Sequence, residues 1–189
     1  MLPTEMPVLT RPPVVLRAFR AEDVGLVQSV AGDALIPLIT TVPASGDASD
    51  ARAYIQRQQE RLASGAGYSF AIADAATGEA VGQAGLWLRN LDEGRASTGY
   101  WIAPQFRRRR YATAALDAIS RWGLSLDGIH RIELYVEPWN EGSWRAAEHV
   151  GYVREGLLRG WQQVGNERRD MYMYGLLPED LAAGLRSER

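Results

Sequence analysis

A short apolar run, an arginine-rich loop and an amphipathic helix follow one another between residues 97 and 126. The run contains aromatic and β-branched residues and ends at Pro104, which is typical of a buried strand. Apolar residues then recur at spacings of three and four, which predicts a helix with one apolar face. They are Ala112, Ala115, Leu116, Ile119, Trp122 and Leu126. A strand, a basic loop and a helix N-terminus are therefore expected to meet at one point.

This junction is expected to bind an anion. The first N–H groups of a helix have no partner within the helix and lie at the positive end of its dipole. Four consecutive arginines add guanidinium groups suited to phosphate oxygens. They are Arg107, Arg108, Arg109 and Arg110. A run of charges can also be a solvated loop, and the basic motif taken alone favours that alternative.

Composition indicates one domain spanning residues 1–189. The chain is 46% hydrophobic and 23% charged, which is enough apolar material for a sizeable core at this length. Its formal net charge is −2, whereas nucleic-acid-binding domains usually carry a marked basic excess. Direct nucleic-acid binding is therefore disfavoured, and any anion site must be local.

Residue types that are rare or absent exclude several chemistries. The chain has no cysteine, so disulfides and thiol catalysis are excluded, and with only His130 and His149 no metal site is expected. The first residues lack both a basic and an apolar region, and no run of about 18 apolar residues exists, so neither a signal peptide nor a membrane span is expected. A cytoplasmic location follows as the default.

Periodicity and turn residues predict an α/β chain. The expected strands are residues 14–19, 68–73, 80–88, 97–103, 131–136, 156–164 and 168–176, and the expected helices are residues 22–31, 50–65, 112–126, 140–150 and 178–185. Residues 35–43 are apolar but interrupted by prolines, which fits either a loop beside a substrate cleft or a connector packed on the core. The order favours a mixed sheet with helices on both faces.

Two segments resemble the motifs of the GCN5-related N-acetyltransferases, the GNAT superfamily. Arg107 to Ala112 matches the ends of the acyl-CoA motif Arg/Gln-x-x-Gly-x-Gly/Ala, although Arg108 and Arg110 stand where glycine is common. Asn140 to Tyr152 resembles the second segment, Asn-x-x-Ser followed by a helix and Gly-Phe/Tyr. The resemblance covers nearly the whole chain and is nearest to the RimJ/RimL branch of ribosomal-protein acetyltransferases.

The resemblance implies a GNAT fold, with a mostly antiparallel sheet of about seven strands. Its central strands, residues 99–103 and 131–136, should splay apart and admit acetyl-CoA or another acyl-CoA as co-substrate, with no metal. The pantetheine arm would bond to the main chain of the first strand, and the pyrophosphate would lie on the helix N-terminus. The residues implied at the acyl-CoA site are Trp101, Ile102, Ala103, Arg107, Arg108, Arg109, Arg110, Tyr111, Ala112, Thr113, Asn140 and Ser143.

The chemistry implied is direct attack of a neutral amine on the thioester. A main-chain N–H near Trp101 would polarise the carbonyl. Ser143 would hydrogen-bond the departing thiolate, with helix capping as its alternative role. Asn140 would bind pantetheine or hold the splayed strand, with a turn as its alternative.

A general base is harder to identify. Gln162 stands where the family often has glutamate, and an amide cannot take a proton at neutral pH. Solvent, or Glu133 or Asp170 through water, could deprotonate the amine instead. A core position for Glu133 and an arginine partner for Asp170 are the favoured alternatives.

The arginines at the two glycine positions bear on acyl-CoA binding. A Cβ at either position could obstruct a close approach of phosphate. Helical φ and ψ need no glycine, however, and the guanidinium groups could reach the 3′-phosphate. We expect acyl-CoA binding that is retained but altered.

Two classes of function remain. The first is an N-acyltransferase acting on a protein N-terminus or a small-molecule amine, with acetyl or another acyl group such as succinyl. The second is a non-catalytic module of the same fold that binds CoA or a partner. A homodimer is left open.

Overall fold

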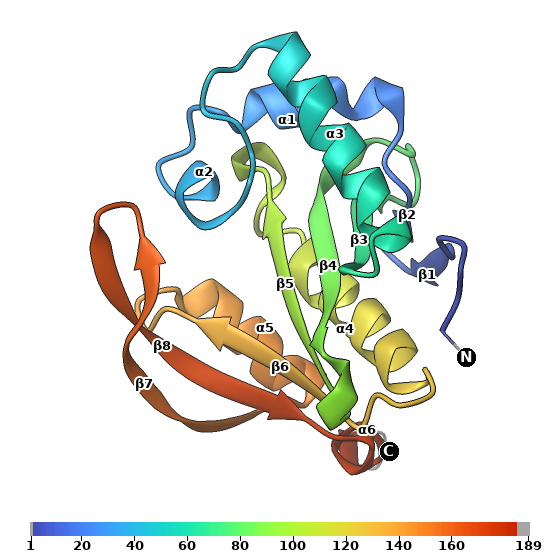
Figure 1. Cartoon of the computed structure of the whole chain (residues 1–189), viewed down its shortest axis with the longest axis vertical. Helices are drawn as coiled ribbons and strands as arrows, with labels where there is room; N and C mark the ends of the chain where they lie inside the picture. The colour runs from blue at the N-terminus through green and yellow to red at the C-terminus, as the bar shows by residue number, and fades with distance from the viewer. Residues whose placement is uncertain (1, 185–189) are drawn as a thin grey trace.

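An eight-stranded mixed sheet forms the centre of the computed structural model, which describes residues 2–184. The strand order is β1-β2-β3-β4-β5-β6-β8-β7 (Figure 1). The strands are β1 (Leu9–Arg11), β2 (Val14–Arg17), β3 (Gly67–Asp74), β4 (Ala80–Asn90), β5 (Arg95–Ile102), β6 (Arg131–Val136), β7 (Val153–Val164) and β8 (Glu167–Leu176). The predicted count of about seven is one too low, because β1 is an added edge strand.

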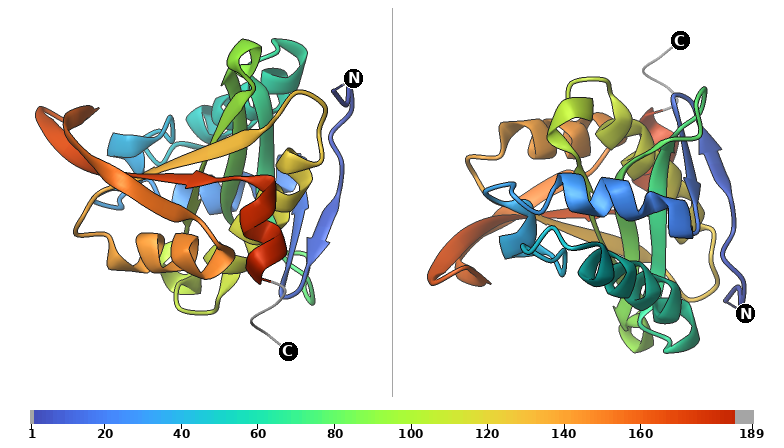
Figure 2. Two further views of the ribbon diagram at one scale, coloured as in Figure 1. Left: turned by 90° about the horizontal axis from the view of Figure 1, so that it is seen from below. Right: turned by 90° about the horizontal axis from the view of Figure 1, so that it is seen from above.

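Helices cover both faces of this sheet (Figure 2). Helix α4 packs on one face with α5 beside it, and α1 and α3 lie on the other. The α-helices are α1 (Val24–Ser29), α2 (Ile36–Ile39), α3 (Ala48–Ala63), α4 (Tyr111–Leu124), α5 (Glu141–Val150) and α6 (Pro178–Gly184). The short 3₁₀ helices are η1 (Ala21–Asp23), η2 (Leu91–Glu93) and η3 (Pro104–Phe106). The expected final helix was drawn to residue 185, which lies outside the described residues.

The apolar stripe of α4 forms the centre of the core. Ala115, Leu116 and Ile119 are fully buried and belong to one cluster with Phe70 of β3 and Leu86 of β4. Burial of the leucine, isoleucine and phenylalanine side chains among them contributes about 1.5–3 kcal/mol each. The packing fixes α4 against the sheet, and so fixes its N-terminus at the end of β5.

The sheet splits between β5 and β6. These parallel strands pair only from Arg95 opposite Arg131 to Thr98 opposite Leu134. Beyond that point β5 stays paired with β4, where Gly82 lies opposite Ile102, and β6 stays paired with β8. Figure 1 shows the two strands diverging from their common end. The predicted splay of the central strands is confirmed.

The apolar segment at residues 35–43 contains the short helix α2. Asp33 Oδ1 accepts hydrogen bonds from Leu35 N and Ile36 N, both at 2.9 Å, and proline is tolerated in a first helical turn. Ile36 is buried in the core, whereas Leu38 is 52% exposed. The segment therefore both packs on the core and projects from it beside the split.

Candidate active site

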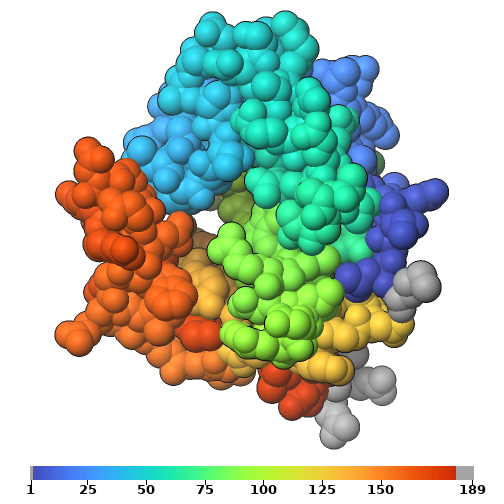
Figure 3. Space-filling model, viewed as in Figure 1, coloured from blue at the N-terminus to red at the C-terminus, as the bar shows by residue number. Residues whose placement is uncertain are grey.

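Two cavities adjoin at the split between β5 and β6. The first has a volume of about 570 Å³ and the second about 530 Å³. Figure 3 shows a hollow bordered by the α2 segment, by β4 and β5, and by the β7–β8 hairpin. The residues that line both cavities are Leu35, Ile39, Tyr100, Trp101, Asn140 and Ser143. A ligand can therefore span both cavities by passing Tyr100 and Ser143.

The free edge of β5 is formed by Tyr100 and Ile102. Ala103 N donates to Val81 O of β4 at 2.9 Å. The carbonyl oxygen of Trp101 also lies against β4, because a Cβ added at Gly82 would be only 2.2 Å from it. The main-chain groups of Trp101 and Ala103 therefore face β4. Main-chain groups alternate in direction along a strand, so those of Tyr100 and Ile102 face the split. The sequence expectation that Trp101 and Ala103 offer free main-chain groups is wrong, because β4 already pairs with them.

The loop before α4 has an unusual backbone. Arg108 and Arg110 adopt φ values of 62° and 63°, in the left-handed region. A residue other than glycine has a conformational energy about 1–2 kcal/mol higher in that region than in the right-handed one. The expectation that both positions have helical φ and ψ is wrong, so these are the positions where glycine would be the favoured residue.

The four arginines point to different surroundings. Arg107 Nε donates to Ile102 O at 3.1 Å, and its Nη2 lies 3.1 Å from Asp33 Oδ2. Arg108 and Arg110 line the second cavity together with Arg107. Arg109 is absent from that lining, and its guanidinium lies 5.7 Å from the centre of the Phe106 ring.

The first turn of α4 lines the second cavity as well. Tyr111, Ala112 and Thr113 all contribute to the wall. Their N–H groups precede the first residues that can bond back within the helix. The second cavity therefore combines free main-chain N–H groups, the dipole of a 14-residue helix and the Arg108 and Arg110 guanidinium groups.

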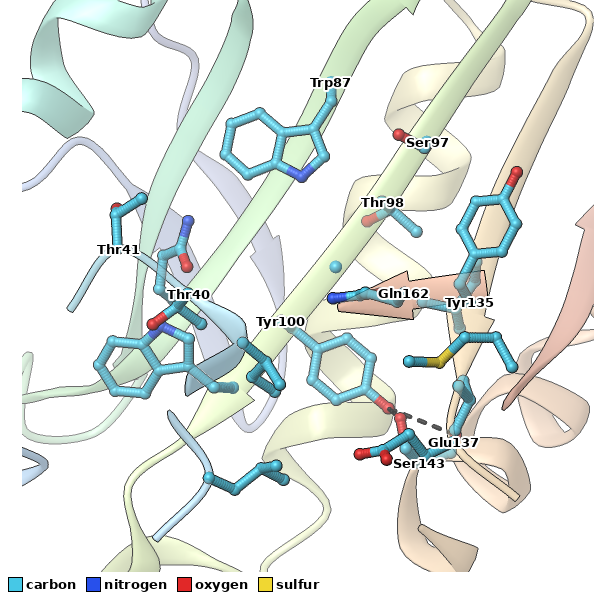
Figure 4. A pocket seen from close by; sticks show the side chains of 18 of the residues that line it. Thr40, Thr41, Trp87, Ser97, Thr98, Tyr100, Tyr135, Glu137, Ser143 and Gln162 are labelled. Atoms are coloured by element: carbon cyan, nitrogen blue, oxygen red, sulfur yellow. Dashed lines mark hydrogen bonds between the residues drawn. The ribbon is translucent and has the colours of Figure 1, made fainter. Parts of the chain in front are cut away.

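The N-terminus of α5 lies opposite β5 across the split. Asn140 is the cap, since its side chain accepts from Ser143 N at 3.3 Å. Ser143 is not the cap, and its Oγ lies 3.0 Å from the Tyr100 hydroxyl (Figure 4). Burial raises the pKa of Tyr100 to about 12, so this hydroxyl keeps its proton at neutral pH. A protonated Tyr100–Ser143 pair thus spans the junction of the two cavities.

Neither of the two carboxylates considered from the sequence faces the site. Glu133 contacts Arg95 at 3.2 Å, Arg131 at 3.1 Å and the Tyr135 hydroxyl at 2.9 Å, which confirms its core position. Burial opposes its ionisation, but these hydrogen bonds outweigh burial and lower the pKa of Glu133. Asp170 accepts from Gly160 N at 2.7 Å, so the expected arginine pairing is not its main contact.

A carboxylate that sequence reasoning missed lies in the first cavity. Glu137 follows the last residue of β6, is 8% exposed and lines this cavity with Gln162. Figure 4 shows it beside Ser143. Arg169 Nε lies 3.9 Å from Glu137 Oε1, at the limit of an ion pair, and pairs more closely with Glu167 at 2.7 Å. Its position between the end of a strand and the Asn-x-x-Ser segment was the only sequence signal.

Two further properties bear on the class of site. Within residues 2–184, no group of three or more histidine, aspartate or glutamate side chains is placed to hold a metal ion. No helix of the described part is long and apolar enough to cross a bilayer.

Comparison with known proteins places this arrangement in context. Residues 14–153 match the model of the acetyltransferase (GNAT) domain. The N-acetyltransferase p20 of Bacillus licheniformis is 27% identical over 169 residues, which cover 89% of this chain and 95% of that protein.

Solved structures share the fold. RimJ of Mycobacterium smegmatis, in complex with CoA-disulfide, has a TM-score of 0.78 at 24% identity. The match covers 97% of this chain and 93% of the RimJ chain. RimL, a ribosomal L7/L12 alpha-N-protein acetyltransferase in complex with coenzyme A, has a TM-score of 0.77 at 16% identity, over 90% of this chain and 98% of its own. The family model covers about three quarters of the sequence, and the predicted GNAT fold is confirmed. The chain belongs to the GNAT acetyltransferase family.

Proposed function

We propose that this protein transfers the acetyl group of acetyl-CoA to a primary amine that enters the first cavity. The observation that carries the proposal is the split of β5 from β6, which leaves the Tyr100 main chain and the Ile102 N–H unpaired with β6, beside the Tyr100–Ser143 pair. The Ile102 carbonyl already accepts from Arg107. Acetyl-CoA would lie in the second cavity with its thioester at that pair. The amine would approach from the opposite side.

The second cavity suits the three parts of acetyl-CoA. Pantetheine amides can bond to the free edge of β5, as an added strand would. The pyrophosphate can accept hydrogen bonds from the N–H groups of Tyr111, Ala112 and Thr113. Arg108 and Arg110 line the same cavity and can pair with the 3′-phosphate.

The reaction would be a direct displacement. The amine nitrogen attacks the thioester carbon, a C–N bond forms, and the carbonyl electrons move onto oxygen. The N–H of Tyr100 can stabilise this oxyanion, in place of the Trp101 N–H that faces β4. The intermediate then loses the C–S bond, and the electron pair leaves with sulfur. Ser143 donates a proton to the thiolate, the Tyr100 hydroxyl reprotonates Ser143 Oγ, and water returns the proton released by the nitrogen to Tyr100.

Glu137 supplies the general base, which the amide of Gln162 cannot be. The nitrogen becomes positively charged as the C–N bond forms, and it must release one proton. Glu137 lines the first cavity beside Ser143, so its carboxylate can take this proton directly or through one water. The presence of both a proton donor and a proton acceptor at the junction favours an enzyme over a non-catalytic CoA-binding module.

The acceptor proposed first is an N-terminal α-amine of a protein. RimL, which shares this fold, is named for action on an N-terminal amine of a ribosomal protein. The hollow bordered by the α2 segment, β4, β5 and the β7–β8 hairpin opens to the surface (Figure 3), so a chain end can enter it. Small-molecule amines are the alternative acceptors, and succinyl-CoA is an alternative donor. A panel of acyl donors and amines would distinguish among them.

Two measurements test this function. Isothermal titration with acetyl-CoA should give saturable heat, and thiol release should follow when peptide amines are added. Ser143→Ala should slow thiol release while leaving acetyl-CoA binding nearly unchanged. Saturable binding without thiol release on any amine would support the non-catalytic alternative, and absence of binding would reject both.

A further inference from the structure

The first cavity has an uneven distribution of charge. Of the described residues that line it, only Arg61, Arg89 and Glu137 are charged. Arg61 lies over the Trp87 ring, 4.7 Å from its centre, and Arg89 follows Trp87 by two residues on β4. Figure 4 shows Trp87 and Glu137 on opposite sides of the cavity. The two cations therefore lie at the end away from the carboxylate.

These two arginines are not neutralised by neighbouring carboxylates. Arg61 Nε donates to Gln58 Oε1 at 2.9 Å, which is a neutral partner. No ion pair to Arg61 or Arg89 is found within residues 2–184, although eight other arginines have carboxylate partners there. Arg89 is also exposed. Both cations thus remain available to a ligand, and the half-buried Arg61 is less screened by water than the exposed Arg89.

The polar wall near Arg61 is held in place. Gln83 Nε2 donates to Ser69 Oγ at 3.0 Å, and Ser69 Oγ donates to Gln58 Oε1 at 3.0 Å. These three side chains are buried, and the same Gln58 oxygen accepts from Arg61. The chain of hydrogen bonds fixes the orientation of Arg61 before a ligand arrives, which lowers the entropy lost on binding.

We infer that the acceptor is a primary amine that also carries an anionic group, such as a peptide with an acidic residue close to its N-terminus. The amine would lie at Glu137 and Ser143, and the carboxylate would pair with Arg61 and Arg89. This inference rests on the proposed function, because it assumes that the first cavity receives the acceptor. It specifies the chemical class of that acceptor from the charges that line the cavity.

The test compares acceptors of equal size. With acetyl-CoA saturating, kcat/KM for thiol release is measured for Ala-Gly-Glu-amide and Ala-Gly-Gln-amide. The glutamate peptide should be favoured roughly fivefold for each arginine engaged, and high salt should reduce the preference. The pair γ-aminobutyrate and butylamine repeats the comparison without a peptide backbone, and so distinguishes a peptide from a small amino acid as the better acceptor.

Arg89→Glu supplies the decisive variant, because an exposed side chain can be replaced without loss of the fold. It should remove or reverse the preference and favour Ala-Gly-Lys-amide. Arg52→Glu is the matched control, since Arg52 is exposed on α3, lies outside the cavity lining and changes the net charge equally. Equal use of the two peptides by the natural protein, or equal shifts in the two variants, would overturn the inference.

Binding separates this inference from the function on which it rests. Both peptides are titrated into the protein saturated with CoA. Tighter binding of the glutamate peptide without any thiol release would support the charge preference and contradict the transfer reaction. Binding of neither peptide would overturn the charge preference, while acetyl-CoA binding alone would still be measurable.

Discussion

The Tyr100 hydroxyl of β5 lies 3.0 Å from Ser143 Oγ at the N-terminus of α5. The contact joins the two elements that border the split sheet, and both residues line both cavities. Because Asn140 caps α5, Ser143 is left with its hydroxyl directed at the junction. The pair is thus placed where a thioester and an amine would meet.

Tyr100→Phe should lower kcat about tenfold, while acetyl-CoA binding stays within about twofold. The variant keeps the ring but removes the donor to Ser143, so the thiolate leaves less readily. Because the pKa of Tyr100 is raised to about 12, no loss of activity from its ionisation should appear below about pH 10 in the natural protein. Thiol release and isothermal titration measure the two quantities. An unchanged kcat would remove Tyr100 from the proton path.

Replacing Arg108 and Arg110 together by glycine should stabilise the protein and impair binding. Glycine adopts the left-handed region without strain, so each replacement should raise the free energy of unfolding by about 1 kcal/mol, measured by urea denaturation. The same variant should lose more affinity for CoA than for dephospho-CoA, because the lost guanidinium groups line the second cavity. Arg109→Gly is the matched control, with no positive φ to relieve and no place in that wall. Equal losses for both nucleotides would reject contact with the 3′-phosphate.

Glu137→Gln should reduce kcat/KM for amines roughly 10- to 100-fold without changing the affinity for acetyl-CoA. The amide keeps the size of the side chain but cannot accept the proton. Glu133→Gln is the comparison, because that carboxylate does not line the cavity and is held by Arg95, Arg131 and Tyr135. It should lower stability while leaving the chemistry of the folded enzyme intact. The reverse pattern would indicate that Glu133 is the base.

Asp33→Asn should destabilise the protein at neutral pH by about 0.5–1 kcal/mol. Burial opposes ionisation of Asp33, but hydrogen bonds from Ile36 and Leu35 and the nearby Arg107 outweigh it and lower its pKa below the usual 3.8. Because the pKa of Asp33 is lower in the folded protein than in the unfolded chain, its ionised form stabilises the fold above pH 3.8. This stabilisation is lost as the pH falls through the pKa of the folded protein. Urea denaturation should therefore show that the natural protein and the variant differ less in free energy of unfolding near pH 3 than at neutral pH. A difference that persists at low pH would mean that the charge of Asp33 is not its cause.

Strong periodicity in the sequence predicted the parts of the fold that carry the site. Alternation in residues 131–136 matches β6 residue for residue, and the apolar stripe of α4 fixed the position of the helix N-terminus. The three-residue strand β1 was missed because Pro12 and Pro13 follow it and it is too short to show a period. Helix α2 was missed because prolines obscure a helix of four residues.

Features of the site that depend on geometry could not be read from residue types. The sequence identified the arginines of the loop but not the positive φ of Arg108 and Arg110, since motif spacing carries no backbone angle. It located the free edge of β5 only to within one residue, because the side that each N–H faces depends on the register with β4. Glu137 enters the site through the divergence of β6 from β5, which is a tertiary relationship.

Amide hydrogen exchange along β5 tests the central claim most directly. Acetyl-CoA lying in the split should slow exchange at Tyr100 and Ile102, whose N–H groups face the gap. The N–H of Ala103 already donates to Val81 O and should change little. Protection at Tyr100 and Ile102 on addition of acetyl-CoA is the predicted result, and unchanged exchange at both residues under saturating acetyl-CoA would contradict the account.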